Sequence, residues 1–451
     1  MLENANVIVQ NMRAADDLAT IAPSARAAGR VTLPGDKSIS HRCAMLASIA
    51  DGVSVIHGYS RGADCTATLA CVRALGADVR RRRDDVLISG RGLHGLREPV
   101  RTLDAANSGT TMRLMSGILA AQPFVSRFTG DASLQRRPMR RIIDPLQRMG
   151  ATIESADGFP PLVIHGAPLK SISFRPAAAS AQIKSCVLFA GLYADGTTCV
   201  EEPIQTRDHT ERALETFGVR VTTSDGRVHV EGGQSLRGCE MHVPGDISGA
   251  AFWGALAAGT PGGEIAIDHV GLNPSRTGLL SVLERAGALV SRELITTGPG
   301  EPSGTLVIRH GTMNSFEVHA AEVAGVIDEI PALAALAVMM PRGCTFSVRG
   351  AAELRVKESD RISALATGMR ALGARIEEFE DGFILESAPL HAATVDARGD
   401  HRLAMAFAIA ATRASDPVTI LGASAVDVSY PGFFDTLAQL TGATSAELGD
   451  G

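Results

Sequence analysis

Short apolar stretches along the chain follow two different patterns. Residues 43–50 and 114–121 are apolar at nearly every position and follow polar, glycine-containing turns, which predicts buried helices. Residues 86–89 and 162–165 are short, rich in Val, Ile and Leu, and followed by glycine, which predicts strands. Because the two patterns alternate along the whole chain, we expect an α/β protein.

One larger pattern recurs six times: a helix-like stretch, a small turn and a β-rich stretch. Each turn contains a glycine directly after the helix-like stretch, and successive glycines lie 68 to 86 residues apart. These are Gly76, Gly150, Gly218, Gly287, Gly373 and Gly442. Glycine suits the left-handed conformation in which many helices end. We therefore expect six copies of one α/β unit.

A second repeat groups the six units as three plus three. The sequence LPGDKS at 33–38 is answered by VPGDIS at 243–248, and an Ala-rich helix is expected after each. We therefore expect two similar lobes, one formed by 36–243 and the other by 31–35 plus 244–451, with 1–30 as a mobile N-terminal extension. The second copy lacks the Lys, His and Arg of the first, so the chemistry should be asymmetric. A ligand site is expected in the cleft between the lobes.

Composition narrows the class of protein. The chain is 45% hydrophobic and 20% charged, as globular proteins are, and its net charge of -6 argues against bulk nucleic-acid binding. No apolar run reaches the roughly 18 residues that span a bilayer. The seven cysteines form no C-x-x-C pair, and no cluster has metal-ligand spacing. We expect a cytoplasmic protein without a metal.

Several motifs share one form, in which glycine or other small residues and a cation precede or open a helix. Helix N-termini favour anions, because their backbone N–H groups and dipole point outward. Alone, each motif could equally be a capped helix or an exposed basic loop; together they predict a small substrate with two or three negative charges. The motifs span residues 34–42, 106–113, 130–141, 179–185, 206–210 and 399–406.

Lysine is rare in this chain and concentrates in such segments. Only four of the 43 basic residues are lysine, and three of them, Lys37, Lys184 and Lys357, lie in candidate functional segments. An ammonium group changes its pKa more readily than a guanidinium does. Lys357 and Arg361 lie four residues apart, which predicts one helix face with Asp360 nearby, although surface ion pairs would give the same spacing.

Two adjacent acids stand out at 328–329, between apolar residues and before a very apolar helix. A half-buried carboxylate has a raised pKa and could act as a base, whereas a plain helix cap is the competing interpretation. The sequence alone leaves both open.

These motifs resemble those of the EPSP synthase (3-phosphoshikimate 1-carboxyvinyltransferase) family, in the family's order over about residues 31–440. The matching stretches read PGDKSxSHR, NSGTTxR, GDxSLxxRPM, SAQxKS, TRDHT, IDExP, LRVKESDR and DHRxAMAF. The resemblance implies an inside-out α/β barrel of the enolpyruvyl transferase type, with two lobes of three βαβαββ units each. It also implies an enzyme of aromatic amino acid biosynthesis that works as a monomer without metal or organic cofactor.

The implied reaction joins phosphoenolpyruvate to the 5-hydroxyl of shikimate 3-phosphate and releases phosphate. By this resemblance Asp328, Glu358 and Lys37 are catalytic. The residues expected to bind shikimate 3-phosphate are Lys37, Ser38, Arg42, Ser180, Ala181, Gln182, Arg207, Asp328 and Lys357. Those expected to bind phosphoenolpyruvate are Lys37, Gly109, Arg137, Gln182, Arg361 and Arg402. Asp328 would be the base, and Lys357 and Glu358 candidates for proton transfer.

Two departures and two alternatives accompany the resemblance. Many members have Ala-Gly-Thr-Ala where this chain has 108–111, and a C-terminal lysine that is missing from 427–431. Gly109 keeps the small residue associated with glyphosate sensitivity, so we expect inhibition competitive with phosphoenolpyruvate. The related UDP-N-acetylglucosamine 1-carboxyvinyltransferases carry a cysteine in a loop that here, at 130–139, has none. A non-catalytic metabolite-binding relative is the other alternative.

Overall fold

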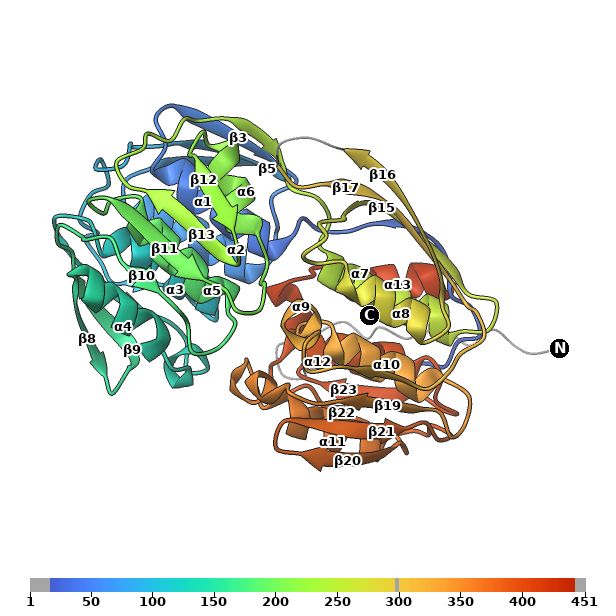
Figure 1. Ribbon diagram of the computed structural model, residues 1–451. Coiled ribbons are helices and arrows are strands. Elements are labelled where there is room, and N and C mark those ends of the chain that lie inside the picture. Colours follow the sequence, from blue (N-terminus) through green and yellow to red (C-terminus); the bar gives the residue numbers. More distant parts are fainter. Residues whose placement is uncertain (1–16, 297–299, 443–451) are drawn as a thin grey trace, which may run out of the picture. The chain divides into compact units, whose positions relative to one another are not determined.

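The computed structural model describes residues 17–296 and 300–442, which form two compact units (Figure 1). Unit 2 comprises Gly35–Pro244 and residues 300–302. Unit 1 comprises residues 17–34, Gly245–Thr296 and residues 303–442. The divisions after residues 34 and 244 fall within the two PGD motifs.

Unit 2 contains three four-stranded sheets and six α-helices among its described residues. Its helices are α1 (Lys37–Ser48), α2 (Ala63–Ala74), α3 (Gly109–Leu119), α4 (Arg140–Met149), α5 (Ala181–Gly191) and α6 (His209–Thr216), with a 3-10 turn η1 (Leu134–Arg136). Its strands are β3 (Val53–His57), β4 (Asp78–Arg82), β5 (Asp85–Ser89), β6 (Leu103–Asp104), β7 (Val125–Thr129), β8 (Thr152–Ala156), β9 (Phe159–His165), β10 (Ser173–Phe174), β11 (Thr197–Glu201), β12 (Val221–Ser224), β13 (Arg227–Glu231) and β14 (Glu240–His242).

The sheets of unit 2 share one βαβαββ topology. In the sheet ordered β6-β7-β9-β8, β6 and β7 are parallel and joined through α3, and the β8–β9 hairpin closes the unit antiparallel to β7. The sheet β10-β11-β13-β12 repeats this around α5 and α6. In the sheet β14-β3-β5-β4, β14 fills the first position although it comes last in the sequence.

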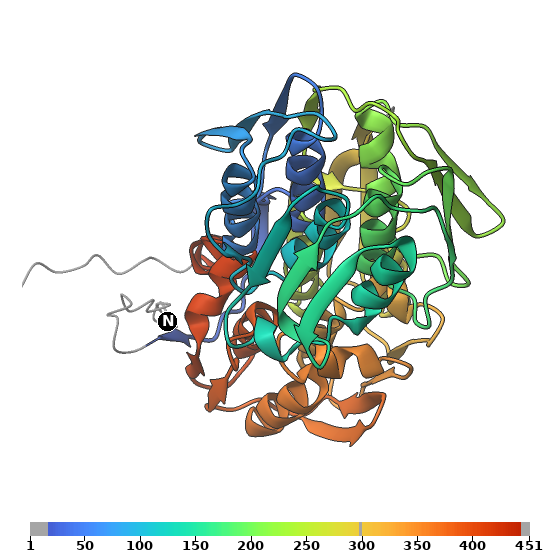
Figure 2. The same cartoon turned by 90° about the vertical axis from the view of Figure 1, so that its left-hand side faces the viewer.

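The helices of unit 2 form the centre of its hydrophobic core. Leu46 of α1, Leu119 of α3 and Phe189 of α5 are fully buried in one apolar cluster. The sheets lie outside and bury alternate residues, as in β5 and β9, which is the pattern of strands with one solvated face. Figure 2 shows α1 and α2 side by side (blue), in agreement with their contacts.

Unit 1 repeats this plan around a separate core. Its helices are α7 (Ile247–Gly259), α8 (Gly278–Arg285), α9 (Val323–Val326), α10 (Ile330–Met339), α11 (Arg361–Ala371), α12 (His401–Ala411) and α13 (Phe433–Thr441), with 3-10 turns η2 (Ala352–Val356) and η3 (Ala423–Val428). Its strands are β1 (Leu18–Ile21), β2 (Ala28–Thr32), β15 (Glu264–Gly271), β16 (Leu289–Thr296), β17 (Ser303–Arg309), β18 (Phe316–Val318), β19 (Thr345–Val348), β20 (Arg375–Phe379), β21 (Gly382–Glu386), β22 (Thr394–Asp396) and β23 (Val418–Leu421).

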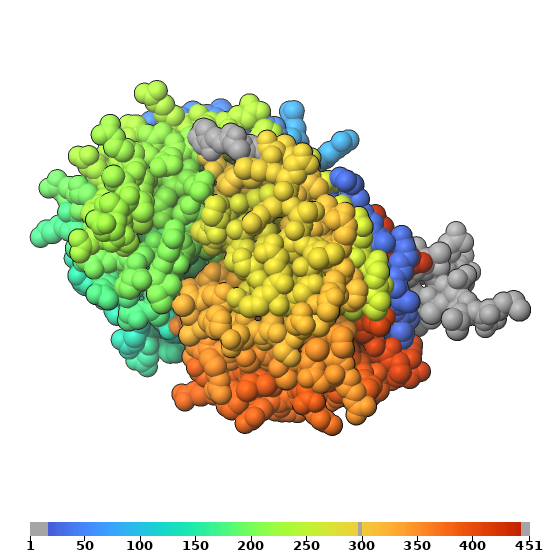
Figure 3. Space-filling view, turned by 45° about the vertical axis from the view of Figure 1, so that its right-hand side comes forward, coloured from blue at the N-terminus to red at the C-terminus, as the bar shows by residue number. Residues whose placement is uncertain are grey.

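The helices α7, α10 and α12 are apolar on almost every side, which fits helices buried all round. Trp253, Leu336 and Phe407 from these helices are fully buried in one cluster. The sheets are ordered β16-β17-β15-β2, β18-β19-β21-β20 and β1-β23-β22. Figure 3 shows the outer surface of the first of these, over β15, β16 and β17 (yellow). Each unit therefore has helices inside and open sheets outside.

The prediction of a mobile extension over residues 1–30 is wrong for its described part. Strand β1 pairs antiparallel with β23, and β2 pairs parallel with β15. These strands complete two sheets that would otherwise each lack a member, so burial of Ile21 and Val31 holds the segment. Residues 1–16 lie outside the described part of the chain.

The glycine repeat is confirmed in backbone geometry. All six predicted glycines have positive φ angles, between 73° and 118°, at the ends of helices. The PGD motifs are also equivalent. The Asp36 N–H donates to the Pro244 carbonyl at 2.8 Å, and the Asp246 N–H donates to the Pro34 carbonyl at 3.0 Å.

Candidate functional site

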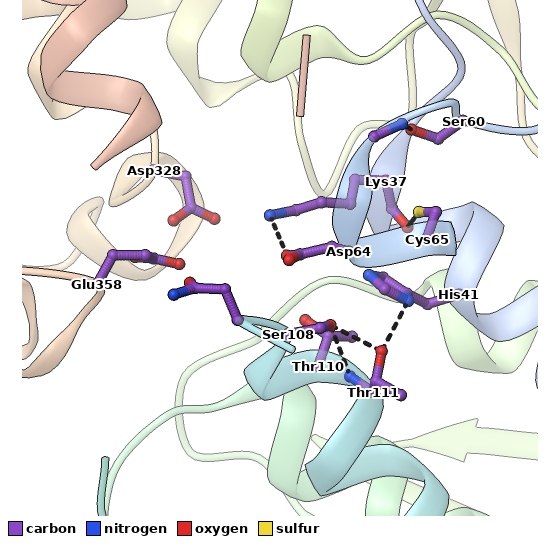
Figure 4. Close-up of polar contacts among 12 residues, drawn as sticks. Lys37, His41, Ser60, Asp64, Cys65, Ser108, Thr110, Thr111, Asp328 and Glu358 are labelled. Carbon is purple, nitrogen blue, oxygen red and sulfur yellow. Dashed lines mark hydrogen bonds and ion pairs between the residues drawn. The ribbon is translucent and has the colours of Figure 1, made fainter. Parts of the chain in front are cut away.

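The first PGD motif places a lysine at the very start of a helix. The Asp36 carboxylate caps α1 by accepting the Ile39 N–H at 2.9 Å, and Lys37 is the first helical residue. The Lys37 ammonium forms a 3.0 Å ion pair with Asp64, as Figure 4 shows. The helix begins earlier than predicted, since residues 37–42 are helical and not part of the preceding turn. The Asp36 cap accounts for this early start.

Arg42 lies one turn further along α1 and joins three helices. Its guanidinium donates to the Ser38 carbonyl at 2.7 Å, to Thr210 Oγ1 of α6 at 2.7 Å and to Ser185 Oγ of α5 at 2.8 Å. Burial, with the nearby positive charge of Arg207, lowers the pKa of Arg42 to about 10. Arg42 and Arg207, both predicted to bind substrate, therefore concentrate positive charge near the starts of α1 and α6.

The start of α3 brings a glycine under two guanidinium groups. Ser108 caps this helix by accepting the Thr111 N–H at 3.0 Å (Figure 4). A Cβ atom on Gly109 would lie 3.1 Å from Nη1 of Arg113 and 3.4 Å from Nη1 of Arg137. The absence of a side chain at Gly109 therefore leaves room for both cations. Like α1, helix α3 begins about five residues earlier than its apolar run predicted.

Arg137 differs from the other arginines of its arginine-rich segment in being buried and held by hydrogen bonds. Its guanidinium donates to the carbonyl and side-chain oxygens of Asn107 at 3.2 and 2.7 Å, and to Ser133 Oγ at 3.1 Å. Only 6% of Arg137 is exposed, whereas the neighbouring Arg136, and Arg140 at the start of α4, are exposed. The loop therefore presents one held arginine next to Gly109.

Gln182 connects the starts of α3 and α5. Its side-chain oxygen accepts from Nη1 of Arg113 at 2.7 Å, and its amide donates to Thr110 Oγ1 at 2.9 Å. Ser180 is the cap of α5. Arg113 belongs to this group although it was not among the predicted site residues. The sequence feature that could have identified Arg113 is its position one turn into the helix that the 106–113 motif opens.

Lys184 is a buried anchor below these helix starts. Its ammonium, with 1% of the side chain exposed, forms ion pairs with Glu202 at 2.8 Å and Glu211 at 2.6 Å. Glu202 also accepts hydrogen bonds from the N–H and hydroxyl of Thr206, directly before Arg207. A cavity of about 420 Å³ opens between residues 175–180 and 201–206 and is lined by Ser180, Lys184 and Thr206.

In unit 1, three cations surround one carboxylate. Asp328 lies between α9 and α10, and its Oδ1 is 3.5 Å from Nη1 of Arg361, 3.9 Å from Nε of Arg402 and 4.0 Å from Nζ of Lys357. Arg402 also donates to the Asp328 backbone carbonyl at 2.9 Å. The Asp328 side chain is 15% exposed, so this carboxylate is partly buried.

Arg361 is held by a set of carboxylates. It contacts Asp400 at 2.8 Å and Glu358 at 2.6 Å with 1% of its side chain exposed. Burial lowers its pKa, but Asp400, Glu358 and Asp328 raise it more, so the net pKa lies above the ordinary value. Asp400 also caps α12 through the Arg402 N–H at 3.0 Å.

The prediction that Lys357 and Arg361 share one helix face is wrong. Lys357 has an extended backbone at the end of η2, whereas Arg361 opens α11 behind its Asp360 cap. The two cations still meet at Asp328, through a turn and not through helical spacing.

Residues 427–431, where many relatives carry a lysine, lie at the end of η3 and after it. Tyr430 accepts a hydrogen bond from the Trp253 indole at 3.0 Å and packs on the core. Among the described residues, no group of three His, Cys, Asp or Glu could hold a metal ion. No helix in the described ranges is long and apolar enough to cross a membrane.

The fold and these cation clusters define a two-unit α/β protein that binds small anionic metabolites. The chain belongs to the EPSP synthase (3-phosphoshikimate 1-carboxyvinyltransferase) family, whose model matches residues 21–437. It is 47% identical over 422 residues to the 3-phosphoshikimate 1-carboxyvinyltransferase of Solibacter usitatus (strain Ellin6076), covering 93% of this chain and 99% of the relative. It is 46% identical over 416 residues to that of Bacillus cereus (strain 03BB102), covering 92% and 96%.

Solved structures agree with this family. An EPSP synthase from Acinetobacter baumannii superposes with a TM-score of 0.83 and 42% sequence identity, covering 94% of this chain and 98% of that one. The enolpyruvyl transferase NikO from Streptomyces tendae gives a TM-score of 0.74 at 18% identity, covering 95% and 97%. At that identity the likeness to NikO concerns the fold alone.

Proposed function

We propose that the two units divide the work of one reaction. This reaction transfers the enolpyruvyl group of phosphoenolpyruvate to the 5-hydroxyl of shikimate 3-phosphate and releases phosphate. Membership of the EPSP synthase family over nearly the whole chain supports the activity. The observation that carries the division of roles lies in unit 1, where Asp328 is a partly buried carboxylate with Arg361, Arg402 and Lys357 within 4.0 Å.

Unit 2 binds shikimate 3-phosphate through the starts of α1, α5 and α6. The 3-phosphate lies by Ser180, Ala181 and Arg207, where backbone N–H groups and a guanidinium favour an anion. Lys37 and Ser38 hold the same substrate, and Arg42 supplies positive charge while bracing the three helices. Gln182 contacts both substrates, because it lies in the first turn of α5 and hydrogen-bonds to Arg113 and Thr110 of α3.

Phosphoenolpyruvate carries a carboxylate and a phosphate, and guanidinium groups bind both kinds of anion. Gly109 leaves space for the substrate against Arg137 in unit 2, and Arg361 and Arg402 of unit 1 pair with its carboxylate or phosphate. The lysine–carboxylate pair of Lys37 and Asp64 opens when Lys37 turns to the substrate. Positioned cations of this kind stabilise the charge that develops as phosphate leaves.

Asp328 removes the proton from the 5-hydroxyl as that oxygen adds to C2 of phosphoenolpyruvate. Glu358 delivers a proton to C3, which gives a tetrahedral intermediate. Asp328 and Glu358 both lie within reach of Arg361, so one guanidinium orients the acid and the base. The C2–O bond to phosphate then breaks with assistance from Lys37 and Lys357, and the Glu358 carboxylate takes a proton back from C3, which forms the enolpyruvyl ether.

A phosphate-release assay tests the activity and its acceptor. We expect rapid phosphate release from phosphoenolpyruvate with shikimate 3-phosphate and none with UDP-N-acetylglucosamine. Release with the nucleotide sugar would favour the related transferase, and tight binding of shikimate 3-phosphate without release would favour a non-catalytic relative. Either result would overturn the proposal.

A further inference from the structure

Asp328 has an acidic neighbour that the proposed mechanism does not use. Glu329 is fully buried, although it directly follows Asp328, whose side chain is 15% exposed. One of its carboxylate oxygens accepts hydrogen bonds from Ser248 Oγ and from Nη2 of Arg276, the latter at 2.8 Å. The two acids of the 328–329 pair therefore face different surroundings, and only one of them is open to a substrate.

Arg276 reaches both sides of Asp328. With 3% of its side chain exposed, it pairs with Glu329, one residue after the proposed base. It also donates to the Gly325 carbonyl in α9, three residues before that base, at 3.4 Å, and to Ser248 Oγ at 2.7 Å. One guanidinium thus ties the end of α9, the start of α10 and the start of α7 together.

We propose that Arg276 and Glu329 are positioning residues that hold the α9–α10 junction and thereby aim the carboxylate of Asp328. The inference rests on the proposed function of Asp328 as the base. A buried ion pair is rarely better for stability than apolar side chains of the same size. A positioning role explains why the pair contacts residues on both sides of the proposed base, because misplacing a catalytic group by about 1 Å can lower the rate about 100-fold.

The same arrangement gives a role to the second PGD motif. Its copy in unit 1 lacks the Lys, His and Arg of the first copy, and the sequence left it without a chemical function. Asp246 caps α7 by accepting the Ser248 N–H at 2.8 Å, which directs the Ser248 hydroxyl to Glu329. The repeat therefore places a substrate-binding lysine in unit 2 and a support for the base in unit 1.

Paired substitutions separate positioning from stability. The double variant Arg276→Met/Glu329→Met removes the buried pair but keeps apolar side chains of similar length, so the unfolding midpoint should change little. We expect kcat to fall about 30- to 100-fold, while KM for phosphoenolpyruvate stays within about twofold. The variant Glu329→Gln keeps an acceptor oxygen for Ser248 and Arg276 and should retain kcat within about threefold. A folded double variant with the kcat of the parent enzyme would overturn the inference.

A single substitution at Ser248 provides a second test with little risk of unfolding the protein. Ser248→Ala removes one hydroxyl from the network and should lower kcat about fivefold, in line with the net value of one hydrogen bond. Ser387→Ala is the matched control, because Ser387 is equally buried in unit 1 but bonds the Pro341 carbonyl at 2.6 Å. Equal kcat values for the two serine variants would count against the proposal.

Asp328→Asn distinguishes this inference from the proposed function. If Asp328→Asn keeps full turnover, the assignment of the base fails and the positioning role fails with it. If Asp328→Asn is inactive while the folded double variant is fully active, only the positioning role fails.

Discussion

In this protein the burial and ion pairing of a side chain, more than its residue type, determine the role it can have. Lys37 and Lys184 both lie in motifs rich in small residues, yet Lys37 opens a helix beside one carboxylate and Lys184 is buried between two. Asp328 and Glu329 are adjacent, yet one is partly exposed and the other is fully buried. The sequence could identify these residues, but burial and pairing decided their roles.

His41 predicts a pH dependence of stability. It is fully buried, its Nδ1 lies 2.6 Å from Thr68 Oγ1, and burial, with Lys37 and Arg42 nearby, lowers its pKa well below 6.5. The unfolded chain takes up a proton below pH 6.5 while the folded protein does not, so stability falls as the pH falls. Between pH 7.5 and 5.5 we expect a loss of about 1.4 kcal/mol from this group, measured by urea unfolding. An unchanged pH dependence in His41→Gln would contradict this origin.

Gly109→Ala should act on one substrate only. The new Cβ would press on the guanidinium groups of Arg113 and Arg137, whose ends can shift by a few tenths of an ångström. We expect KM for phosphoenolpyruvate to rise about tenfold, about 1.4 kcal/mol, with KM for shikimate 3-phosphate unchanged. Steady-state kinetics with each substrate varied in turn measures the difference, and an equal rise in both KM values would refute it.

Glyphosate provides a related test of the same position. We expect it to compete with phosphoenolpyruvate in the parent enzyme, because Gly109 leaves the space beside Arg137 open. The inhibition constant should rise in Gly109→Ala. Turnover that is unaffected by a large excess of glyphosate would contradict this prediction.

At the level of elements, helix starts were predicted by type but not by position. The polar residues before the apolar runs belong to the helices α1 and α3 themselves, because Asp36 and Ser108 cap them several residues upstream. The predicted helix face over 357–361 is wrong for the opposite reason, since the helix begins only at Arg361. Capping geometry depends on side-chain hydrogen bonds, which apolar periodicity does not encode.

Lys184→Met tests the anchor that joins α5 to α6 and to Glu202, the residue directly after β11. The variant leaves Glu202 and Glu211 buried without their cation, so we expect the free energy of unfolding to fall by about 3–5 kcal/mol. Lys170→Met is the control, because Lys170 is exposed and should change stability by less than about 0.5 kcal/mol. Urea denaturation measures both, and equal stabilities would show that the triad is not an anchor.

At the scale of the molecule, the repeat predicted the plan of the fold. Six glycines at helix ends and two PGD motifs indicated two sets of three α/β units, which the structure contains. The contribution of residues 18–32 to two sheets was missed, because β1 and β2 are short and pair with strands more than 200 residues away. Pairing over such distances leaves no local signal in the sequence.

Two hydrophobic cores predict two unfolding events. Trp253 is the single tryptophan of the chain and is buried in the core of unit 1, so its fluorescence reports that core. Phe189→Ala leaves a cavity in the core of unit 2 and should cost about 3–5 kcal/mol there. We expect the circular dichroism transition to broaden toward lower urea, while the Trp253 transition keeps its midpoint. A joint shift of both signals would show a single cooperative unit.

The most direct test of the account is a rapid-quench measurement of phosphate formation by the parent enzyme and Asp328→Asn, with shikimate 3-phosphate and phosphoenolpyruvate both saturating. We predict that the parent enzyme forms phosphate and the enolpyruvyl ether in equal amounts. The variant, which keeps the shape of the side chain but loses the base, should react about 10²–10⁴ times more slowly. An Asp328→Asn enzyme that reacts at the parent rate would contradict the account.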